Sequence, residues 1–302
     1  MISILIPIYN QDVTKLIGEL ADQASRAKVP FEILAFDDAS KEKYRIVNRK
    51  VNHLFGVNYV ESERNLGRSA MRNRLARTAT MPYLLFLDCD VKIPKRSFIK
   101  RYAEAAKAGY PVVNGGIIYS KRKPGKTKRL HWLYGRYREA LPATKRQRKP
   151  YFHIMTGNLL IDREKYLGLE LDESLSGYGH EDTLFGKMLR DREIPVLQID
   201  NPVQHLGLET SKKFMKKQDA ALENLLRIKG KHTEFETRLT RTYDQLMRQL
   251  LGPWFMDRIQ RRKDKIMSNL LSPEPRLYNL DLYKLAKWHE LLTDQGRKKT
   301  DH

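Results

Sequence analysis

One apolar run, from Tyr83 to Leu87, constrains the fold of this chain more than any other feature. The run is unbroken, it follows Pro82, and it ends in two carboxylates, Asp88 and Asp90. A continuous hydrophobic run without alternation is typical of a strand buried on both faces, as at the centre of an α/β sheet. We therefore expect an α/β fold with a mostly parallel central sheet flanked by helices.

The two carboxylates predict a cation site at the end of this strand. In open α/β sheets ligands bind beyond the carboxyl ends of the strands, where Asp88 and Asp90 are expected to lie. Carboxylates this close repel each other unless a cation lies near both. A divalent ion that also holds substrate phosphates would meet this need. The alternative is a solvated turn with an Asp at each end, which the D-x-D spacing alone does not exclude.

Three earlier segments, 2–8, 31–36 and 57–60, predict further buried strands. Between the first two, a helix is expected through Leu16 and Leu20 with Asp12 as its cap. The order strand, helix, strand indicates a βαβ unit.

The segment 63–74 is a loop that turns into a helix rich in arginine. Helix N-terminal amides and guanidinium groups both favour phosphate oxygens, so this segment suits a diphosphate. An ordinary basic helix face explains the same pattern.

Four short motifs then occur in a specific order. They are Pro7-x-Tyr9-Asn10, Asp37-Asp38-Ala39-Ser40, Asn65-Leu66-Gly67 with Ala70-Met71-Arg72-Asn73, and Leu87-Asp88-Cys89-Asp90. In order and approximate spacing the chain resembles the nucleotide-sugar-dependent glycosyltransferases of family 2, which have the GT-A fold. The resemblance covers roughly residues 1 to 207. Taken together, the four motifs are far more specific than any one of them.

The resemblance implies roles for individual residues in binding a nucleotide-sugar donor. It implies that Asp38 recognises the base. Asp37 is the other candidate for this role, and the alternative for Asp37 is that it fixes the loop. Arg72 is expected at the nucleotide, Asp88 at the ribose or a metal-bound water, and Asp90 at the metal itself. The donor-binding set implied by these motifs also includes Pro7, Tyr9 and Asn65.

A second chemical centre is expected around Glu181 and Asp182. The segment from Ser176 to Asp182 is similar to the G-x-G-x-E-D segment of GT-A enzymes that transfer galactose or N-acetylgalactosamine. An acceptor hydroxyl is a poor nucleophile until a positioned carboxylate takes its proton. We expect Asp182 to be that base in an inverting displacement. Capping of the helix N-terminus by two acids is the alternative.

Other residues around this centre are expected to contact the sugars. Glu181 would bind sugar hydroxyls of the acceptor or donor, and Tyr178 would stack on a sugar face. Gly157 lies in a tight turn before a strand, where the backbone can approach a ligand closely. These assignments complete the predicted catalytic and donor-binding set.

His205 is predicted as a metal ligand. A neutral imidazole, Asp90 and two phosphate oxygens would coordinate Mn²⁺ or Mg²⁺, and the imidazole favours Mn²⁺. Similar GT-A enzymes place such a histidine soon after the E-D helix. The metal set is therefore Asp90, His205 and Asp88, although a lone histidine is more often structural.

The charge of the chain points to anionic partners. Lys and Arg number 57 against 36 Asp and Glu, which gives a formal net charge of +21. Nucleic acid, an anionic membrane surface and a nucleotide substrate all fit this balance. A single cysteine, Cys89, fits a reducing cytosol. The first residues do not predict a signal peptide, and no apolar run approaches the roughly 18 residues of a membrane span. We expect a cytoplasmic location, at most peripheral at the inner face of the membrane.

The basic stretch 121–149 carries Trp132, Tyr134 and Tyr137 among its lysines and arginines. We expect a solvated loop first. The alternatives are a mobile loop over the donor, the acceptor or a lipid surface, and base stacking by single-stranded nucleic acid.

The composition changes after residue 210. Phe235, Leu239, Tyr243, Leu246 and Leu250 recur at helical spacing, and Trp254, Phe255, Ile259, Ile266 and Leu270 do so again with basic residues between them. Such helices would dock on the catalytic domain, form a homodimer or lie on an anionic leaflet. The prolines at 273 and 275 predict a break, and the polar end from Gln295 to His302 predicts a frayed terminus.

The domain boundaries follow from these features. We predict a GT-A catalytic domain over 1–210, with a nucleotide-binding half at 1–115 and an acceptor-binding half at 116–210. A basic helical extension is predicted over 211–302.

The predicted function is metal-dependent, inverting transfer of a hexose or N-acetylhexosamine. The donor would be a UDP-sugar, and the acceptor a hydroxyl of a glycan, a glycolipid or another lipid-linked acceptor. A retaining enzyme, a nucleic-acid-binding protein and a catalytically silent adaptor are the rival interpretations. A processive synthase is disfavoured because no Q-x-x-R-W segment is present.

Overall fold

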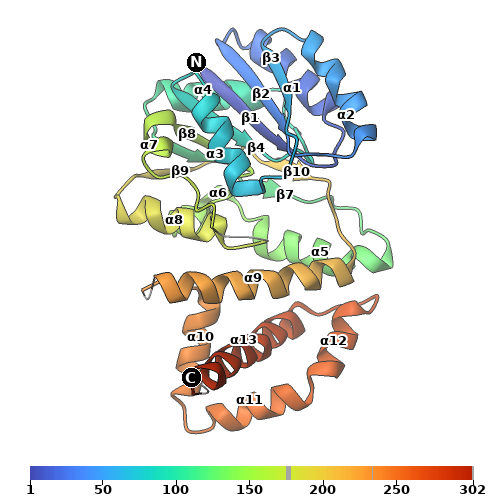
Figure 1. Cartoon of the computed structure of the whole chain (residues 1–302), viewed down its shortest axis with the longest axis vertical. Coiled ribbons are helices and arrows are strands. Elements are labelled where there is room, and N and C mark those ends of the chain that lie inside the picture. Colours follow the sequence, from blue (N-terminus) through green and yellow to red (C-terminus); the bar gives the residue numbers. More distant parts are fainter. Residues whose placement is uncertain (175–177, 233, 301–302) are drawn as a thin grey trace. The chain divides into compact units, whose positions relative to one another are not determined.

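The computed structural model describes residues 1–174, 178–232 and 234–300, with side chains to residue 295 (Figure 1). The chain forms two compact units. The first unit comprises Met1–Ser120, Glu139–Ser176 and Glu181–Gly207, and the second comprises Lys121–Arg138, Gly177–His180 and Leu208–His302.

The first unit is built on a seven-stranded sheet with the order β3-β2-β1-β4-β8-β6-β9. Its strands are β1 Ile2–Ile8, β2 Phe31–Asp37, β3 Val57–Glu61, β4 Tyr83–Leu87, β6 Val112–Asn114, β8 Asn158–Asp162 and β9 Val196–Gln198. The first four strands are mutually parallel, β8 runs antiparallel to both of its neighbours, and β9 is parallel to β6. The strand β4 is fourth of seven, so the predicted central position of the 83–87 run is confirmed.

Helices cover both faces of this sheet. On one face Ile4 and Ile6 of β1 pack in the core that includes α1 (Thr14–Arg26) and α4 (Phe98–Lys107). On the other face Leu5 packs in the core that includes α3, α7 and α8. The helices of this second face are α3 Arg68–Thr78, α7 Arg163–Leu167 and α8 Glu181–Asp191. Successive residues of a strand point to opposite faces, which explains why the central strands carry unbroken apolar runs.

A second, three-stranded sheet extends the first unit. Its order is β5-β10-β7, with β5 Val91–Lys92, β7 Ile117–Ile118 and β10 Val203–His205. The chain passes from β6 to β7 through Gly115 and Gly116. A Cβ added at Gly115 would lie 2.1 Å from the Tyr102 hydroxyl oxygen, so only glycine fits this corner.

Short helical elements fill the remaining connections of the first unit. They are α2 Glu42–Asn48, η1 Arg49–His53, α6 Ala143–Arg146 and η4 Pro150–His153, whereas η3 Gly135–Glu139 lies almost entirely in the second unit. Asp12, predicted as the cap of α1, lies one residue before the observed N-cap Val13 and accepts a hydrogen bond from the Thr14 amide at 2.9 Å.

The basic stretch 121–149 is not the solvated or mobile loop that we expected. It forms η2 Lys126–Lys128, α5 Arg129–Tyr134, η3 and α6. Trp132 is buried in the second unit, with the Arg136 guanidinium over its ring. In the first unit Arg146 is 2% exposed and donates hydrogen bonds to carbonyl oxygens, including that of Ile199 at 2.7 Å. Burial of these side chains fixes a segment whose composition indicated solvent exposure.

The second unit is helical. In addition to α5 it contains α9 Ser211–Lys231, α10 Arg238–Met247, α11 Gly252–Arg261, α12 Lys263–Leu271 and α13 Leu277–Thr300. The segments predicted as amphipathic correspond to α10 and to the pair α11 and α12, whereas α9 and α13 were not predicted. Leu250, expected on an apolar helix face, is 96% exposed because α10 ends at Met247. The break at the prolines is followed by α13, which extends to Thr300, and residues 301 and 302 of the predicted frayed terminus lie outside the described residues.

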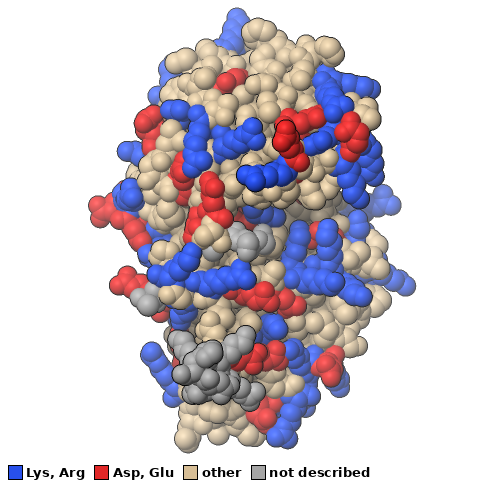
Figure 2. Space-filling model, viewed as in Figure 1, with Lys and Arg blue, Asp and Glu red and all other residues tan. Residues whose placement is uncertain are grey.

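The surface charge is distributed over the chain. Figure 2 shows Lys and Arg over the visible face of both units, with Asp and Glu between them. Among the described residues, no helix is long and apolar enough to cross a membrane.

Candidate active site

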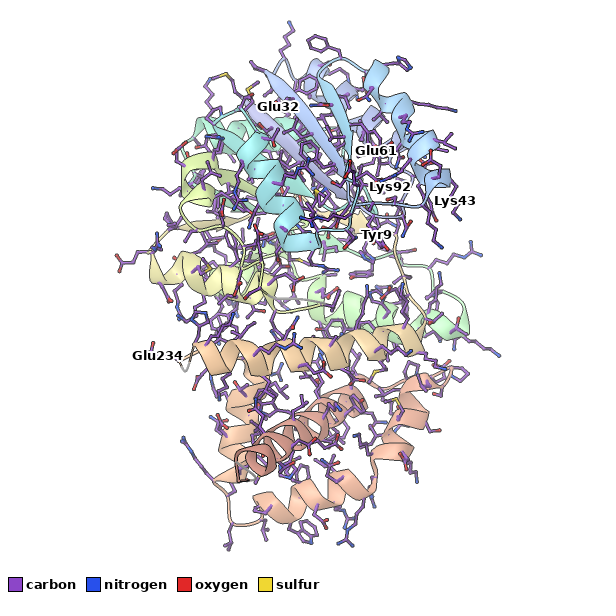
Figure 3. All side chains as sticks on the ribbon, viewed as in Figure 1. Tyr9, Glu32, Lys43, Glu61, Lys92 and Glu234 are labelled. Atoms are coloured by element: carbon purple, nitrogen blue, oxygen red, sulfur yellow. The ribbon has the colours of Figure 1, made fainter. Side chains whose placement is uncertain are left out.

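The loops that follow β1 and β2 are bound to each other. Asn10 has a φ of +52°, a left-handed conformation that asparagine tolerates better than most residues. Its amide donates to the Ser40 Oγ at 2.7 Å, and its Oδ1 accepts from the Lys41 amide at 2.9 Å. Pro7 lies within β1. Tyr9 lies just beyond the end of this strand and is 57% exposed (Figure 3).

Asp37 and Asp38 serve the second of these loops in different ways. Asp37 is fully buried and accepts from the Tyr59 hydroxyl at 3.2 Å. Asp38 accepts from the backbone amides at 66 and 67, at 2.6 and 3.0 Å, while its carbonyl accepts from the Asn65 side chain at 3.0 Å. The structure therefore brings Asp38 and Asn65 together, and Asp37 lies deeper. Recognition of a base by either residue stays a prediction.

Arg72, Asp88 and Gly157 form one cluster at the carboxyl end of β4. Arg72 of α3 is 6% exposed, and its Nη2 donates to Asp88 Oδ1. Among the described residues the Arg72 Nε has no hydrogen-bond acceptor. A Cβ added at Gly157 would lie 2.2 Å from Asp88 Oδ2. The glycine is therefore required for Asp88 to occupy this position.

The small sheet brings Asp90 to His205. The strand β10 runs antiparallel to β5, and His205 lies opposite Val91, the residue that follows Asp90. As a result His205 Nε2 lies 3.4 Å from Asp90 Oδ2. A Cβ added at Gly207 would lie 2.1 Å from the same oxygen, so the backbone approaches the pair closely.

The Asp90 and His205 pair fits part of a divalent cation site. Two ligand atoms of an octahedral ion at about 2.1 Å from it lie about 3 Å apart. The observed 3.4 Å separation needs only a small adjustment. Within the described part of the chain, no group of three or more His, Cys, Asp or Glu side chains is arranged to hold a metal. Asp88 bonds to Arg72 instead, and its role as a metal ligand stays a prediction.

Glu181 and Asp182 are the first two residues of α8. Glu181 is 8% exposed, and its Oε1 accepts from Arg68 Nη1 at 2.9 Å. Asp182 Oδ1 accepts from the Thr156 hydroxyl at 2.6 Å and from the Thr156 amide at 3.3 Å. Thr156 lies one residue before Gly157, so the turn that contacts Asp88 also holds Asp182.

The environment of Asp182 favours its protonated form. Burial, followed by the negative charge of Glu181, raises the pKa of the Asp182 carboxyl to about 6. The Thr156 hydrogen bond and the positive charge of Arg72 act in the opposite direction. The charge of Asp88 raises the pKa further, so the two acidic centres influence each other. A carboxylate with a pKa near neutrality is suited to proton transfer.

Tyr178 belongs to the second unit, in which Lys217 Nζ lies 4.6 Å from the centre of its ring. Its proposed stacking on a sugar is untested. Ser176 and Gly177, which begin the predicted glycine-rich segment, lie outside the described residues.

Three residues of the site were missed by sequence reasoning. Thr156 holds Asp182, Arg68 holds Glu181, and Gly207 leaves room for Asp90. Two of them stood beside residues that we had singled out: Thr156 precedes Gly157, and Gly207 follows His205 by two positions. Nothing in the spacing of Arg68 distinguishes it from the other arginines of its helix.

Comparison with known proteins identifies the family. The model of Glycosyl transferase family 2 matches residues 3–166, which is more than half of the chain. An uncharacterized glycosyltransferase of Haemophilus influenzae is 37% identical over 92 residues. These residues are 30% of this chain and 29% of that protein, so the match spans less than a third of the relative.

Solved structures show the same fold. A mannosyltransferase of Pyrobaculum calidifontis, in complex with GDP-Man and Mn²⁺, superposes with a TM-score of 0.53 at 15% identity. The match covers 75% of this chain and 63% of that one. S. aureus TarS 1–349, in complex with UDP, superposes with a TM-score of 0.50 at 16% identity, over 98% of this chain and 91% of that one. The GT-A fold predicted from the motifs is thereby confirmed, and the chain belongs to glycosyl transferase family 2.

Proposed function

We propose that this protein transfers a hexose or N-acetylhexosamine from a UDP-sugar to a hydroxyl group of a glycan, a glycolipid or a lipid-linked glycan. We propose further that the reaction is metal-dependent and inverts the anomeric configuration. The observation that carries the proposal is the arrangement of Asp182. Its pKa is about 6, Thr156 fixes one of its oxygens, and it responds to the charges of Arg72 and Asp88.

Asp182 is the general base in this proposal. Thr156 occupies Oδ1, which leaves Oδ2 to take the proton of the acceptor hydroxyl as that oxygen attacks the anomeric carbon. A base is most effective when its pKa lies near the working pH, because it is then deprotonated yet still basic. A pKa of about 6 meets this condition near neutrality. Glu181, held by Arg68, would accept hydrogen bonds from sugar hydroxyls.

The donor nucleotide would bind at the loops beyond β1, β2 and β4. Arg72 supports this assignment because its Nε is buried and has no acceptor among the described residues. An anionic ligand oxygen would satisfy it. Asp88 would accept from the ribose, and Tyr9 would cover the nucleotide from its exposed position. Of two structurally similar enzymes, one was solved with UDP and the other with GDP-Man. The identity of the nucleobase in the donor, uracil or guanine, is therefore an important part of the proposal to test.

Asp90 and His205 would hold the divalent ion, for which we propose Mn²⁺. When bound, such an ion offsets the charge of the diphosphate leaving group. The 3.4 Å separation of the two side chains and the close backbone at Gly207 support this assignment. A mixed nitrogen and oxygen ligand pair favours Mn²⁺ over Mg²⁺.

Release of UDP tests the proposal without knowledge of the acceptor. The protein is incubated with a panel of UDP-sugars and Mn²⁺, and the UDP formed by slow transfer to water is measured. We expect release from one UDP-sugar, loss of release on chelation, and loss in Asp90→Ala. Release that continues in the presence of a chelator would contradict the metal assignment.

The anomeric outcome needs a separate measurement. The configuration of the product, followed by NMR, distinguishes inversion from retention. A retained configuration would overturn the role of Asp182 as the base of a single displacement, although it would leave the donor site in place.

A further inference from the structure

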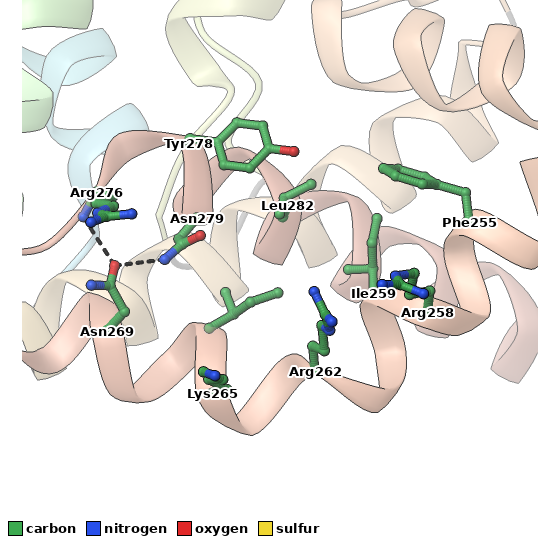
Figure 4. Close-up of a pocket in the computed structure, with 11 residues that line it drawn as sticks. Phe255, Arg258, Ile259, Arg262, Lys265, Asn269, Arg276, Tyr278, Asn279 and Leu282 are labelled. Atoms are coloured by element: carbon green, nitrogen blue, oxygen red, sulfur yellow. Dashed lines mark hydrogen bonds between the residues drawn. The ribbon is translucent and has the colours of Figure 1, made fainter.

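A pocket of about 400 Å³ lies within the second unit, between α11, α12 and the start of α13 (Figure 4). Four basic side chains line it: Arg258, Arg262, Lys265 and Arg276. None of its described lining residues is acidic. The pocket therefore concentrates positive charge on a concave surface, a shape that favours an anionic ligand.

The basic residues of the pocket differ from their neighbours in having no counter-ion. Among the described residues none of the four forms an ion pair. The adjacent Arg261 pairs with Asp257 at 2.9 Å, and Lys263 pairs with Glu290 at 2.5 Å. These two neighbouring cations are thus paired within the protein, whereas the four that line the pocket have no ion-pair partner among the described residues.

Two of these cations, Arg262 and Arg276, come from different sides of the pocket, and a hydrogen bond fixes the backbone of Arg276. Figure 4 shows Arg262 reaching from the junction of α11 and α12 toward α13. The Arg276 amide donates to Asn269 Oδ1 at 3.1 Å, and the Asn279 side chain donates to the same oxygen at 2.7 Å. Asn269 therefore ties the start of α13 to α12 and holds the two sides of the pocket together.

The interior of the pocket is apolar. Ile259 and Ile266 are buried beneath it, and Phe255 and Leu282 are half-buried in its wall. A ligand that carried only negative charge would leave this surface unused. A ligand with a phosphate group and a hydrocarbon part would use both the basic and the apolar side chains.

Exposed apolar side chains continue from the pocket along α11. Trp254 is 57% exposed and Leu251 is 67% exposed. The Arg258 guanidinium lies 5.5 Å from the centre of the Trp254 ring, which connects Trp254 to the pocket. Tyr278, which lines the pocket, is 65% exposed. Tryptophan, tyrosine and arginine are the side chains that favour the interface between lipid headgroups and hydrocarbon.

We infer that this pocket binds the phosphate headgroup of an anionic membrane lipid, with Trp254 and Leu251 entering the headgroup region beside it. The site needs neither the donor nor the metal, so it stands or fails independently of the proposed transfer reaction. It would bring the enzyme to a membrane surface, where lipid-linked acceptors are found.

Vesicle binding of the full chain tests this inference. The protein is sedimented, without nucleotide or metal, with phosphatidylcholine vesicles that contain or lack phosphatidylglycerol. We expect binding only to the anionic vesicles at physiological salt. The double variant Arg262→Gln with Arg276→Gln should bind about ten- to thirtyfold more weakly, because each basic residue at an anionic surface contributes about a factor of five.

A matched variant separates the pocket from general charge attraction. Arg248→Gln with Arg261→Gln removes the same two charges from exposed positions of the second unit that do not line the pocket. We expect less than about a threefold loss for this variant. Equal losses for the two double variants would overturn the pocket as the site. Their thermal unfolding temperatures, compared with that of the parent, show whether each variant is folded.

Trp254 provides a second measurement. The chain has three tryptophans, of which Trp132 and Trp288 are buried. A blue shift of the fluorescence on adding anionic vesicles, absent in Trp254→Phe, is the expected result. No shift would overturn the entry of this residue into the headgroup region.

Soluble competitors identify the source of the phosphate. Glycerol phosphate and a single-stranded oligonucleotide are added to the vesicle assay separately. The lipid assignment predicts weak competition by both. An oligonucleotide that binds the parent more tightly than the vesicles, and does so through Arg262 and Arg276, would replace the lipid with nucleic acid.

Discussion

The two units of this protein differ in whether the charged side chains of their candidate sites have partners within the protein. In the first unit the acidic side chains of the site are held by donors from the protein: Asp88 by Arg72, Glu181 by Arg68, and Asp182 by Thr156. In the second unit the basic side chains of the α11–α13 pocket have no acidic partner among the described residues.

This difference indicates which kind of ligand would complete each site. The carboxylates of the first unit already have a fixed geometry before a ligand arrives, which is what the proposed proton transfer and metal binding would require. Unpaired cations on an apolar surface have no such geometry and are completed by an anion. Substitutions in the site of the first unit should therefore strongly reduce the rate of the proposed transfer reaction. Substitutions in the pocket of the second unit should instead weaken binding to an anionic membrane.

The largest effect is expected for Asp182→Asn. Loss of the general base should reduce UDP release by about 10²- to 10⁴-fold. Donor affinity should change little, because Asp182 is assigned to the acceptor hydroxyl. Turnover and calorimetric donor binding are measured on the same preparation. A variant that keeps more than a tenth of the parent rate would exclude Asp182 as the base.

The same variant should be more stable than the parent at neutral pH. The folded-state pKa of Asp182, about 6, is above its value in the unfolded chain, so the folded state binds the proton more tightly. The stabilising contribution of this group is therefore present at low pH and is lost as the pH rises to about 6. Above that pH, Asp182→Asn should raise the free energy of unfolding by about 1–3 kcal/mol. Equal stability at all pH values would contradict the raised pKa.

Substitutions at two separate glycines test whether donor binding depends on the position of Asp88. In Gly157→Ala the new Cβ would lie 2.2 Å from Asp88 Oδ2, so Asp88 must leave its bond to Arg72. We expect donor affinity to fall by about ten- to a hundredfold. Gly18→Ala is the control, because nothing lies within 4 Å of its added Cβ. It should leave donor binding unchanged and stabilise α1 by about 0.5–1 kcal/mol. Equal donor affinities in the two variants would refute the requirement for glycine at 157.

The pH dependence of turnover should show the same carboxylate. Since the base must be deprotonated, UDP release at saturating donor should fall about tenfold per pH unit below about pH 6. Above this value the rate should level off. A rate that stays constant from pH 7 to pH 5 would show that a group with a lower pKa accepts the proton.

The smallest effect is expected for Thr156→Val. The Thr156 hydroxyl lowers the pKa of Asp182 by hydrogen bonding to its charged form. Its removal should move the acidic limb of the pH profile to higher pH, while the rate on the plateau changes less than in Asp182→Asn. Serine at this position should restore the parent profile. An unshifted limb in Thr156→Val would assign a merely structural role to the hydroxyl.

Much of the first unit could be predicted because its strands are buried on both faces. The run from Tyr83 to Leu87 and the segments that became β1, β2 and β3 have the observed boundaries to within one residue. The acidic residues at the ends of these segments therefore lie at strand ends, as expected. Partners from distant segments were harder to predict: Arg68 and Glu181 are 113 residues apart, and no local pattern relates them.

The second unit was harder to predict because the packing of its helices against one another determines which side chains are buried. The stacking of His131 on Phe214, with ring centres 4.8 Å apart, helps to order a segment whose own composition suggested a loop. In α13 the buried Tyr283 and Trp288 stand beside Lys284 and Lys287, and this mixture of apolar and charged residues obscured the helical pattern. The basic residues were recognised, but their division into paired and unpaired groups required the structure.

Thermal stability in the presence of nucleotide-sugars tests the central proposal most directly. A ligand that binds only the folded protein raises its unfolding temperature. The parent and Asp90→Ala are melted with UDP-, GDP- and CDP-sugars, with Mn²⁺ present or chelated. The account predicts a rise with a UDP-sugar that requires Mn²⁺ and is absent in Asp90→Ala. No rise with any nucleotide-sugar, or an equal rise in Asp90→Ala, would contradict it.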